Sequence, residues 1–544
     1  MLPSKLFVFM LPLALFVDGE WTIYSSRGIE VISNASNRAA RRTLNEIEQF
    51  RNAVGTMLGV QDAGSRWPIR VLVLKRSRDL TVPPSLRLAR DAYIGGVIAE
   101  SDLSALFRRD LTRILMDDNT GRMPANIEKG LETLFTTLQI DGTRVTLGAP
   151  PPAPERDRDW ARVHMLAVTP DYSGKLRVLL GNLQRGIPED VAYRNAFGKL
   201  PAQIEREVDA YARGENFGTI PLSGLPLNPQ RDFIEKPYSD LAAKIALADL
   251  TPSRAAYEAI LKLESGAAAA HEGLGLMALR EKQPEEARRH FAAAVEAGSR
   301  SAQAQLEAGN ARQAAELNPK WAEPHIRLAR DAPEPAQKIE HLTKATALDP
   351  RNSKLWKELA ELFEAENRFA DAAKAWAGAE RAAASAEERE KLSQIRREND
   401  QKRIEAAYAE KMRIAAEKQR ELDQLRDEAL TRIREAEEKA NAGAAPREGK
   451  VEQWWTGPTA SGRITGVLQQ VECGKSQTRL IVQADGKTTR LLIRDPSKIV
   501  VQGTRQETLS CGPQRPPRPV AIDYFEKPDA KTATAGEAAV IEFR

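Results

Sequence analysis

Residues 21–214 alternate short apolar runs with stretches of helical periodicity, which is typical of a mixed α/β domain. Apolar, β-branched runs predict strands, and apolar residues at helical spacing predict helices. The predicted elements are strands at 28–33, 68–74 and 92–99 and helices at 41–58, 103–116 and 124–138. A proline-rich segment at 150–154 predicts a linker or exposed loop, and a helical pattern returns from Asp159 to Gly214. We assign residues 20–237 to this first domain.

A second pattern, with a long repeat, occupies residues 238–386. Its clearest unit runs from Ser353 to about Ala386 and places large and small residues at positions 4, 7, 8, 11, 17, 20, 24 and 27 of a 34-residue frame. These residues are Trp356, Leu359, Ala360, Phe363, Phe369, Ala372, Trp376 and Ala379. A second unit spans Ala268 to Ser301. The spacing resembles that of tetratricopeptide repeats, in which large and small residues interlock two antiparallel helices.

The other units are less regular. Leu317-Asn318-Pro319 and Leu348-Asp349-Pro350 mark repeat ends, but the units that they close are shorter than 34 residues. Predicted helices at 241–250 and 254–263 resemble a degenerate first unit, so we expect four to five units in all. A single unit cannot bury its own apolar face, so the repeats should stack into a solenoid with a concave binding surface.

The resemblance implies that the first helix of each unit lines this concave groove. The groove residues implied by the frame are Glu272, Leu276, Arg280, Arg330, Lys357 and Glu361. Grooves of this family commonly bind extended or helical peptides, so we expect a protein or peptide partner. The mixed charge of these side chains indicates no preferred ligand charge.

Residues 387–442 contain neither proline nor glycine and are rich in Glu, Lys, Arg and Ala. This segment predicts one long helix, roughly 85 Å at about 1.5 Å per residue. Its larger apolar residues are sparse: Leu392, Ile395, Ile404, Met412, Leu422, Leu425, Leu430 and Ile433. Two interpretations stay open, a solvated single helix held by ion pairs one turn apart and a self-associating coiled coil.

Residues 450–544 alternate apolar and polar positions, which predicts a small all-β barrel or sandwich. The predicted strands are 462–471, 478–484, 488–493, 499–502, 519–524 and 538–543. An Asp485-Gly486 pair predicts a hairpin turn. Cys473 and Cys511 both fall here and predict a disulfide, with two buried free thiols as the alternative. The adjacent Trp454-Trp455 pair predicts either a carbohydrate or peptide platform or simple packing against the first strand.

The chain begins with a continuous apolar run from Leu6 to Val17 behind Lys5. Twelve residues are too few to span a bilayer, which needs about 20. A secretory signal peptide cleaved near Gly19 is therefore expected, with an uncleaved anchor as the alternative. No later segment is long and apolar enough to cross a membrane. The mature protein should be periplasmic or secreted.

Composition narrows the function classes. At 544 residues the chain is too long for one hydrophobic core, so several domains are expected. Its 80 basic and 76 acidic side chains leave a formal charge of only +4. This balance gives no electrostatic reason to expect nucleic acid as a partner.

The first domain resembles one family in its helical part. Its relevant segments read Arg109-Asp110-Leu111-Thr112-Arg113, then Gly121-Arg122-Met123-Pro124, then Glu128-Lys129-Gly130-Leu131-Glu132. Proteins that combine a zinc-metallopeptidase-like (gluzincin-like) domain with tetratricopeptide repeats carry H-E-x-x-H, then roughly L-P-x-W-x-x-E-G-L-A-E. Residues 190–211 also resemble this family, whose likeness covers residues 20 to about 215.

The zinc chemistry of that motif is lost here. Arg109 and Arg113 stand at the two histidine positions, Lys129 at the third ligand position, and Asp110 at the position of the catalytic glutamate. Zinc needs neutral or anionic ligands, so three cations exclude this metal site. Two interpretations remain: a basic cleft that binds an anion, or a relic in which these cations pair with Asp110, Asp117, Glu128 and Glu132.

No other catalytic site is predicted. The histidines at 271, 290, 325 and 341 lie in the repeats, where packing or surface roles are expected, and neither metal nor cofactor is predicted. We predict a multidomain, non-catalytic scaffold that binds a protein partner through the solenoid. The alternatives are a divergent metallopeptidase with unrecognised ligands and a glycan- or cell-wall-binding protein that uses the C-terminal β domain.

Overall fold

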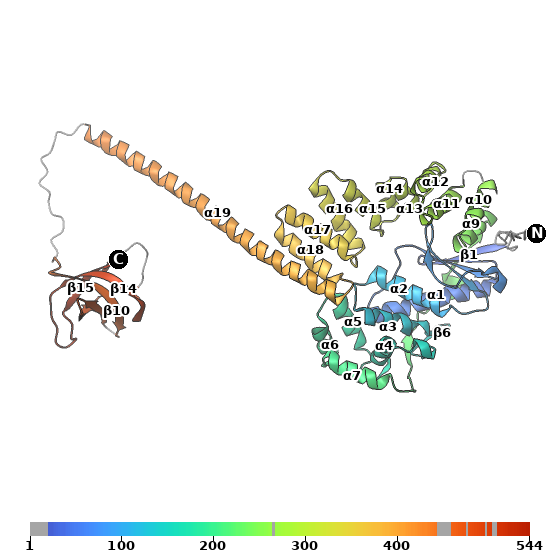
Figure 1. The fold of residues 1–544 in the computed structure, drawn as a ribbon, viewed down its shortest axis with the longest axis horizontal. Helices are drawn as coiled ribbons and strands as arrows, with labels where there is room; N and C mark the ends of the chain where they lie inside the picture. The colour runs from blue at the N-terminus through green and yellow to red at the C-terminus, as the bar shows by residue number, and fades with distance from the viewer. Residues whose placement is uncertain (1–19, 264–266, 443–458, 475–476, 496–497, 503–508) are drawn as a thin grey trace, which may run out of the picture. The chain divides into compact units, whose positions relative to one another are not determined.

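The computed structural model describes residues 20–263, 267–442, 459–474, 477–495, 498–502 and 509–544 (Figure 1). The chain divides into two compact units, one ending at Glu421 and one beginning at Leu422. The predicted signal peptide with its cleavage site near Gly19, and the pair Trp454-Trp455, lie outside the described residues. Among the described residues, no helix is both long and apolar enough to cross a membrane.

The first domain is built on a six-stranded sheet of order β4-β5-β3-β2-β1-β9. Its strands are β1 (Trp21–Ser26), β2 (Ile29–Ser33), β3 (Ile69–Leu74), β4 (Arg87–Leu88), β5 (Tyr93–Ile98) and β9 (Ile234–Tyr238). The central pairs β2–β3 and β3–β5 are parallel, and the outer pairs are antiparallel. The three predicted strands are confirmed as β2, β3 and β5, whereas β1 and β9 were not predicted.

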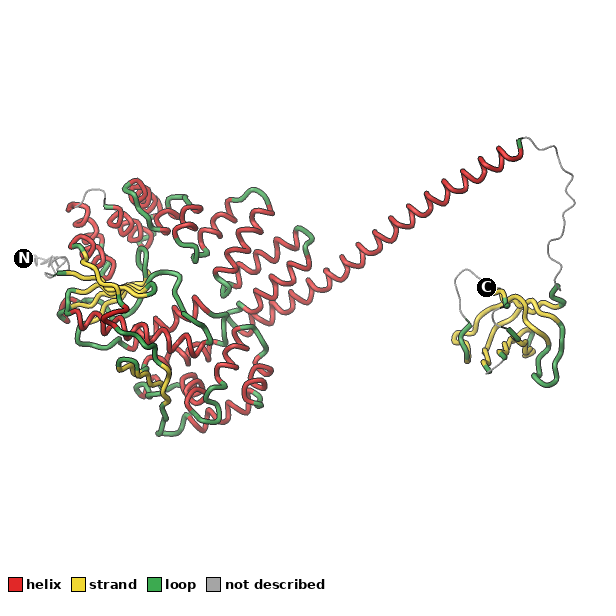
Figure 2. Tube along the Cα trace, turned by 180° about the vertical axis from the view of Figure 1, so that it is seen from behind, coloured by secondary structure: helices red, strands yellow, loops and turns green. Residues whose placement is uncertain are grey.

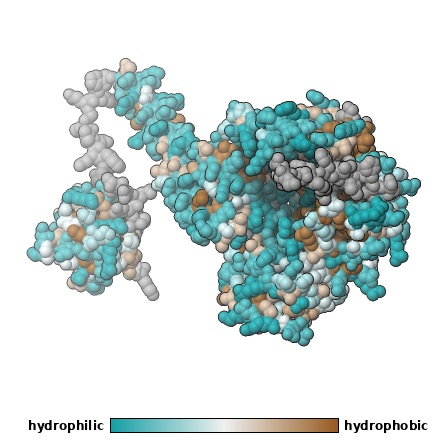
Figure 3. Space-filling model, turned by 45° about the vertical axis from the view of Figure 1, so that its right-hand side comes forward, coloured by the Kyte–Doolittle hydropathy of each residue, from teal (hydrophilic) through white to brown (hydrophobic). Residues whose placement is uncertain are grey.

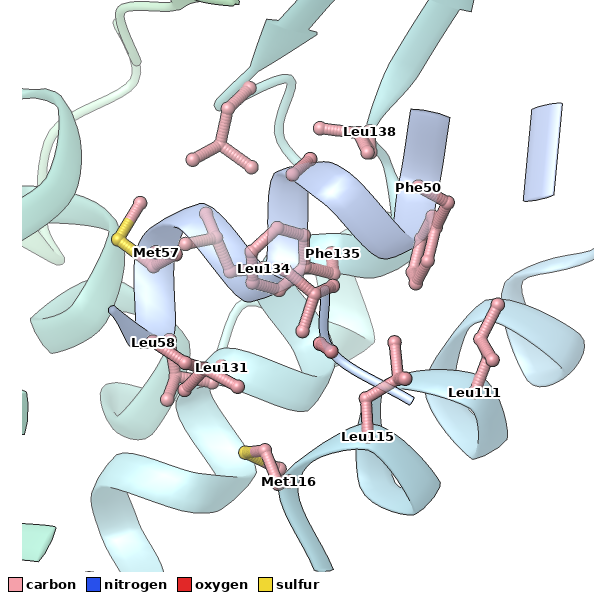
Figure 4. Packing of buried hydrophobic residues seen from close by; sticks show 14 of the residues in the cluster. Phe50, Met57, Leu58, Leu111, Leu115, Met116, Leu131, Leu134, Phe135 and Leu138 are labelled. Carbon is pink, nitrogen blue, oxygen red and sulfur yellow. The ribbon is translucent and has the colours of Figure 1, made fainter. Parts of the chain in front are cut away.

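Helices cover one face of this sheet and form the rest of the domain. They are α1 (Asn37–Leu58), α2 (Ala105–Asn119), α3 (Ala125–Thr136), α4 (Arg158–Val168), α5 (Leu176–Gln184), α6 (Glu189–Phe197), α7 (Pro201–Tyr211) and α8 (Pro229–Asp232). Short 3-10 turns occupy Ser77–Asp79 and Ala153–Glu155, and a small sheet joins β6 (Gln139–Asp141), β7 (Arg144–Leu147) and β8 (Ile220–Ser223). Phe50 of α1 meets Phe135 of α3 edge to face at 5.9 Å, beside Leu111 and Leu115 of α2 (Figure 4).

Five antiparallel helix pairs follow, at the upper end of the predicted four to five units (Figure 2). They are α9 (Asp240–Leu250) with α10 (Arg254–Leu263), α11 (Ala268–Arg280) with α12 (Pro284–Glu296), α13 (Ala302–Glu307) with α14 (Ala311–Leu317), α15 (Glu323–Asp331) with α16 (Pro335–Leu348), and α17 (Ser353–Ala365) with α18 (Phe369–Arg381). Small residues receive large ones between paired helices: a Cβ on Gly378 would lie 2.5 Å from the Trp356 ring. A Cβ on Gly275 would lie 2.9 Å from Phe291. This interlock is the one predicted for tetratricopeptide-type units.

The first solenoid helix also belongs to the core of the first domain. Ala243, Ala246, Leu247 and Leu250 of α9 are buried against the sheet face opposite α1, in a cluster that includes Leu72. The sheet is therefore sandwiched between its own helices and the first repeat. Because exposing an apolar sheet face to water is unfavourable, α9 contributes to the stability of the first domain.

Helix α19 (Ala386–Asn441) confirms the predicted long helix. Its first turns pack on the last helix pair, where Leu392 and Asn399 are buried. Glu364 of α17 accepts hydrogen bonds from Asn399 (3.0 Å) and Lys402 (2.8 Å). From residue 409 to 442 every side chain is exposed.

The second unit contains a β domain whose sheet closes on itself. Its strands are β10 (Gly462–Cys473), β11 (Thr478–Ala484), β12 (Lys487–Ile493), β13 (Val500–Gln502), β14 (Gly512–Phe525) and β15 (Gly536–Phe543). The sheet order is β12-β11-β10-β14-β15-β13, and a parallel pairing of β12 with β15 closes a ring of five strands. Asp485 and Gly486 both have positive φ in the predicted turn between β11 and β12. The predicted Cys473–Cys511 disulfide is confirmed.

Candidate partner-binding surface

The four residues singled out by the predicted peptidase resemblance lie on α2 and α3, and each of the three cations among them has a carboxylate partner. Arg109 Nη2 lies 2.7 Å from Glu155, and Arg113 Nη2 lies 3.0 Å from Glu132. Lys129 Nζ lies 3.0 Å from Asp157 and 3.6 Å from Asp159. These ion pairs link α2 to α3 and α3 to the start of α4. The neighbouring carboxylates therefore neutralise the charges of the three cations.

Asp110, which the resemblance would place at the position of a catalytic base, makes structural contacts. Its carboxylate accepts a hydrogen bond from the Leu86 backbone N–H at 3.1 Å and lies 3.6 Å from Arg113 Nη1. Burial raises the pKa of Asp110 above its ordinary value. The predicted pairing with Asp110 and Glu132 is found for Arg113, whereas Asp117 and Glu128 pair with Arg351 of the solenoid instead. The described residues include no group of three or more His, Cys, Asp and Glu side chains arranged to hold a metal ion.

Three successive turns between helix pairs hold the solenoid on the first domain. The turn at 299–301 contacts Arg90, the turn at 318–321 contacts Arg66 and Trp67, and the turn at 349–351 contacts Arg66 and α2. We call these contacts the seam. Two of these turns contain the predicted repeat ends, Asn318-Pro319 and Asp349-Pro350.

Arg90 is the buried centre of the seam near the first repeats. Its Nε lies 2.8 Å from Asp249 of α9, and its Nη1 donates to Glu272 of α11. Tyr257 donates to the same Asp249 carboxylate at 2.9 Å, and Ser299 donates to Glu272. The carboxylates Asp249 and Asp91 hold the pKa of Arg90 above its ordinary value against the effect of burial.

A second cluster joins α2 and α3 to the last helix pairs. Arg351 Nη2 lies 2.7 Å from Glu128 and 3.2 Å from Asp117, and Arg66 Nη2 lies 3.2 Å from Asp349. Trp67 and Trp321 meet with ring centroids 5.1 Å apart. Together with the Arg90 cluster, these contacts attach several helix pairs to the first domain.

The middle unit, α13 with α14, is much shorter than its neighbours. These helices have 6 and 7 residues, against 13 in each of α11, α12, α17 and α18. Gly309 ends α13 early because it adopts φ +93°, a conformation that favours glycine. Asn318-Pro319 follows the end of α14. The missing turns leave a gap in the stack.

A cavity of about 850 Å³ opens at this gap, and we call it the hollow. Its wall includes Arg300, Asn310, Arg312, Gln313, Glu316 and Asp331, with Leu317 and Leu328 as apolar contacts. Gln305 is buried beneath it, donating to the Ser299 carbonyl at 3.1 Å and accepting from Asn310 at 2.9 Å. The hollow is thus a polar recess with a small apolar part, and the hydrogen-bonded amide of Gln305 forms its floor.

Charged side chains around the hollow form no ion pair with another described residue. Residues 300–334 are all described and contain ten charged side chains, and none of them forms an ion pair within the described part of the chain. On both sides of this segment ion pairs are frequent, for example Arg254 with Glu286 and Lys344 with Glu340. The surface visible in Figure 3 is mostly hydrophilic, with hydrophobic residues scattered over it. Recognition at the hollow is therefore expected to be polar.

The six predicted groove residues are not equivalent in the structure. Glu272 is buried in the seam with Arg90, and Lys357 lies 3.2 Å from Glu388 of α19. Leu276 packs against the α11–α12–α13 cluster. Arg280, Arg330 and Glu361 are exposed and make no ion pair among the described residues. Glu272 is thus corrected from a groove residue to a seam residue, and the hollow was not predicted.

No protein-family model matches the chain, and no curated protein matches it. Several solved structures resemble part of it, among them the following three. YrrB, "a TPR protein with an unusual peptide-binding site", is 17% identical, with 28% of this chain and 89% of that chain covered and a TM-score of 0.23. MamA is 18% identical, with 29% and 98% covered and a TM-score of 0.23. PilF of Pseudomonas aeruginosa is 17% identical, with 31% and 87% covered and a TM-score of 0.24. The helix-pair assignment rests on the interlocking of α9 to α18 and not on these likenesses.

Proposed function

We propose that this protein is a non-catalytic scaffold that binds a polypeptide partner in the hollow of its solenoid. The observation that carries the proposal is the 850 Å³ recess bounded by charged side chains that have no partner within the described chain. Leaving charges unpaired beside one another offers little stability to the free protein, but it keeps them available for a ligand.

A polypeptide suits this recess better than a uniformly charged ligand. Arg300 and Arg312 offer donors to carboxylates, while Glu316 and Asp331 offer acceptors to Lys or Arg side chains. The exposed amides of Asn310 and Gln313 can bond to the N–H and C=O groups of an extended backbone. Leu317 and Leu328 can receive one apolar side chain. We therefore expect a peptide segment of mixed charge.

The proposal includes the absence of peptidase activity in the first domain. The residues at the former ligand positions, Arg109, Arg113 and Lys129, are cationic and engaged by carboxylates, which leaves them unsuited to bind Zn²⁺. The role that we propose for this domain is support, because its surface anchors three turns of the solenoid through the seam.

We also propose a periplasmic or secreted location. The apolar segment from Leu6 to Val17 supports it, and the Cys473–Cys511 disulfide fits an oxidising compartment. Binding of glycans by the β domain has less support, since Trp454-Trp455 lies outside the described residues and the aromatic side chains of Tyr524 and Phe543 pack against the core of the domain.

The test is selection of a displayed random-peptide library on the immobilised full chain. Selected peptides should bind wild type, and the double charge reversal R300E/R312E should weaken binding about tenfold or more, which corresponds to about 1.4 kcal/mol. A matched control, R397E/R413E, reverses two exposed arginines of α19 and should bind as wild type. Peptides that bind both double variants equally well would place the binding surface elsewhere.

A further inference from the structure

Four of the five histidines of the chain form two pairs, each across one helix pair. His271 of α11 faces His290 of α12 with Nδ1 atoms 3.2 Å apart, and His325 of α15 faces His341 of α16 with Nδ1 atoms 3.4 Å apart. These two units stand immediately before and after the short unit α13–α14. The imidazole pairs therefore bracket the hollow.

The chemistry of each pair depends on its protonation. A hydrogen bond between two Nδ1 atoms needs one ring to donate and the other to accept. One added proton can be accommodated, because an imidazolium still donates to a neutral ring. A second proton removes the acceptor and sets two positive charges against each other. Double protonation should therefore push the paired helices apart.

Neighbouring charged groups also disfavour double protonation of the first pair. His290 Nε2 lies 3.8 Å from Glu286, but that carboxylate is already 2.7 Å from Arg254 of α10. Burial, and then the neighbouring His271, lower the pKa of His290, and Arg254 and Arg289 act in the same direction against Glu286.

Burial and neighbouring charges disfavour protonation of the second pair in the same way. Burial lowers the pKa of His325, aided by His341 and Lys344 and opposed by Glu340. Burial also lowers the pKa of His341, with Lys344 and Arg312 acting in the same direction against Glu340. Arg312 belongs to α14 and lines the hollow, so it connects this pair to the proposed binding surface.

We propose that the two imidazole pairs form a proton-sensitive latch that opens the solenoid on either side of the hollow as the pH falls. Ser299 and Arg300 follow α12, and Leu328 and Asp331 lie on α15, so loosening of these helices moves two walls of the hollow. The latch regulates the proposed binding of a polypeptide and rests on that function for its biological consequence. The loosening itself needs no ligand.

The direction of the pH effect follows from linkage. Because the folded-state pKa values of His290, His325 and His341 lie below the ordinary value of 6.5, these three side chains bind protons more readily in the unfolded chain. The stabilising contribution is fully present above pH 6.5 and is lost as the pH falls through the lower folded-state values. Acid should therefore loosen α11–α12 and α15–α16 first.

The experiment combines two measurements on the full chain, with a chelator present and no ligand added. Histidine-selective NMR should show two coupled pairs, each with one titration step well below the ordinary histidine range. Amide exchange of residues 299–331, normalised to the histidine-free pair α17–α18, should rise about tenfold or more between roughly pH 7 and 5.5, a change of about 1.4 kcal/mol.

The variant H290Q/H341Q keeps a hydrogen-bonding side chain in each pair but cannot be doubly protonated, so its normalised exchange should stay flat. Should that variant fail to fold, H271Q/H325Q tests the same pairs from the other helices, and the wild-type titration stands alone. Four imidazoles that titrate independently near their ordinary value, with flat exchange in wild type, would overturn the latch. That result would leave peptide binding at neutral pH untouched, so the two proposals fail separately.

Discussion

At the scale of single residues, Arg90 shows how the seam is held. Its guanidinium is buried between Asp249 and Glu272, which come from different helix pairs, while its own backbone belongs to the first domain. Removing one member of such a cluster leaves the other charges buried without a partner. This destabilises the folded state more than replacing the whole cluster with apolar residues would.

Replacing Arg90 with leucine should therefore lower the free energy of unfolding of the first unit by about 3–5 kcal/mol. Denaturant unfolding of the full chain, followed by tryptophan fluorescence, measures it. The matched control is Arg288→Leu on α12, where the side chain is 66% exposed and pairs only with Glu285, so the expected change is under about 1 kcal/mol. Equal, small effects of both substitutions would show that the cluster does not hold the domains together.

The sequence could identify individual residues only where chemistry is local. Arg109, Arg113 and Lys129 were singled out because the resemblance rests on short sequence segments, and the loss of a zinc site there stays a prediction. The carboxylates that pair with these cations, Glu155, Asp157 and Asp159, could not be predicted, since they lie in the loop before α4 and in its first turn. Glu272 was misplaced for the same reason: the frame put it on the first helix of its unit, but its partner Arg90 is 182 residues away.

At the scale of elements, α19 changes character along its length. Its first turns are anchored by Glu364, which also accepts a hydrogen bond from Trp376 at 2.7 Å. Beyond this anchor the side chains from 409 to 442 are exposed, and ion pairs one turn apart, such as those of Arg413 with Glu410 and Glu417, contribute a few tenths of a kcal/mol each.

Replacing Glu364 with alanine should loosen the anchored part of α19. Hydrogen exchange of residues 392–402 should become faster by about fivefold to tenfold, because three hydrogen bonds to one charged acceptor are lost together. The control is Glu361→Ala on the same helix, where the side chain is exposed, and its exchange pattern should match wild type. Unchanged exchange in the Glu364 variant would mean that apolar packing around Leu392 alone docks the helix.

Elements with a strong period were predicted well, and elements defined by distant partners were not. The 34-residue frame and the uninterrupted run before Gly443 gave α11, α12, α17, α18 and α19. Strand β9 was not predicted, because Ile234–Tyr238 contains a proline and little apolar pattern, yet it pairs with β1 at the sheet edge. The shortness of the unit between Ser301 and Trp321 was visible, and it was the signal that could have predicted the hollow.

At the scale of the first unit, the solenoid packs on the first domain. Helix α9 covers one face of the sheet, and the seam holds three later turns on the first domain. One edge of the solenoid is therefore in contact with the first domain. Removing the repeats would expose Leu72 and its neighbours to water. The informative variants are therefore substitutions at the hollow, because a deletion would test folding and binding together.

The central claim is that the hollow receives a polypeptide, and site-directed photo-crosslinking tests it most directly. A photoreactive amino acid is placed at Gln313 in the hollow or, as a control, at Lys374 of α18, whose side chain is 79% exposed. Both full-length proteins are illuminated in envelope extract of the producing cells, with and without an excess of a library-selected peptide. We predict a discrete protein adduct from Gln313 that the peptide abolishes, and none from Lys374. Adducts of equal yield from both positions, or a partner captured by the protein but never crosslinked from Gln313, would contradict the account.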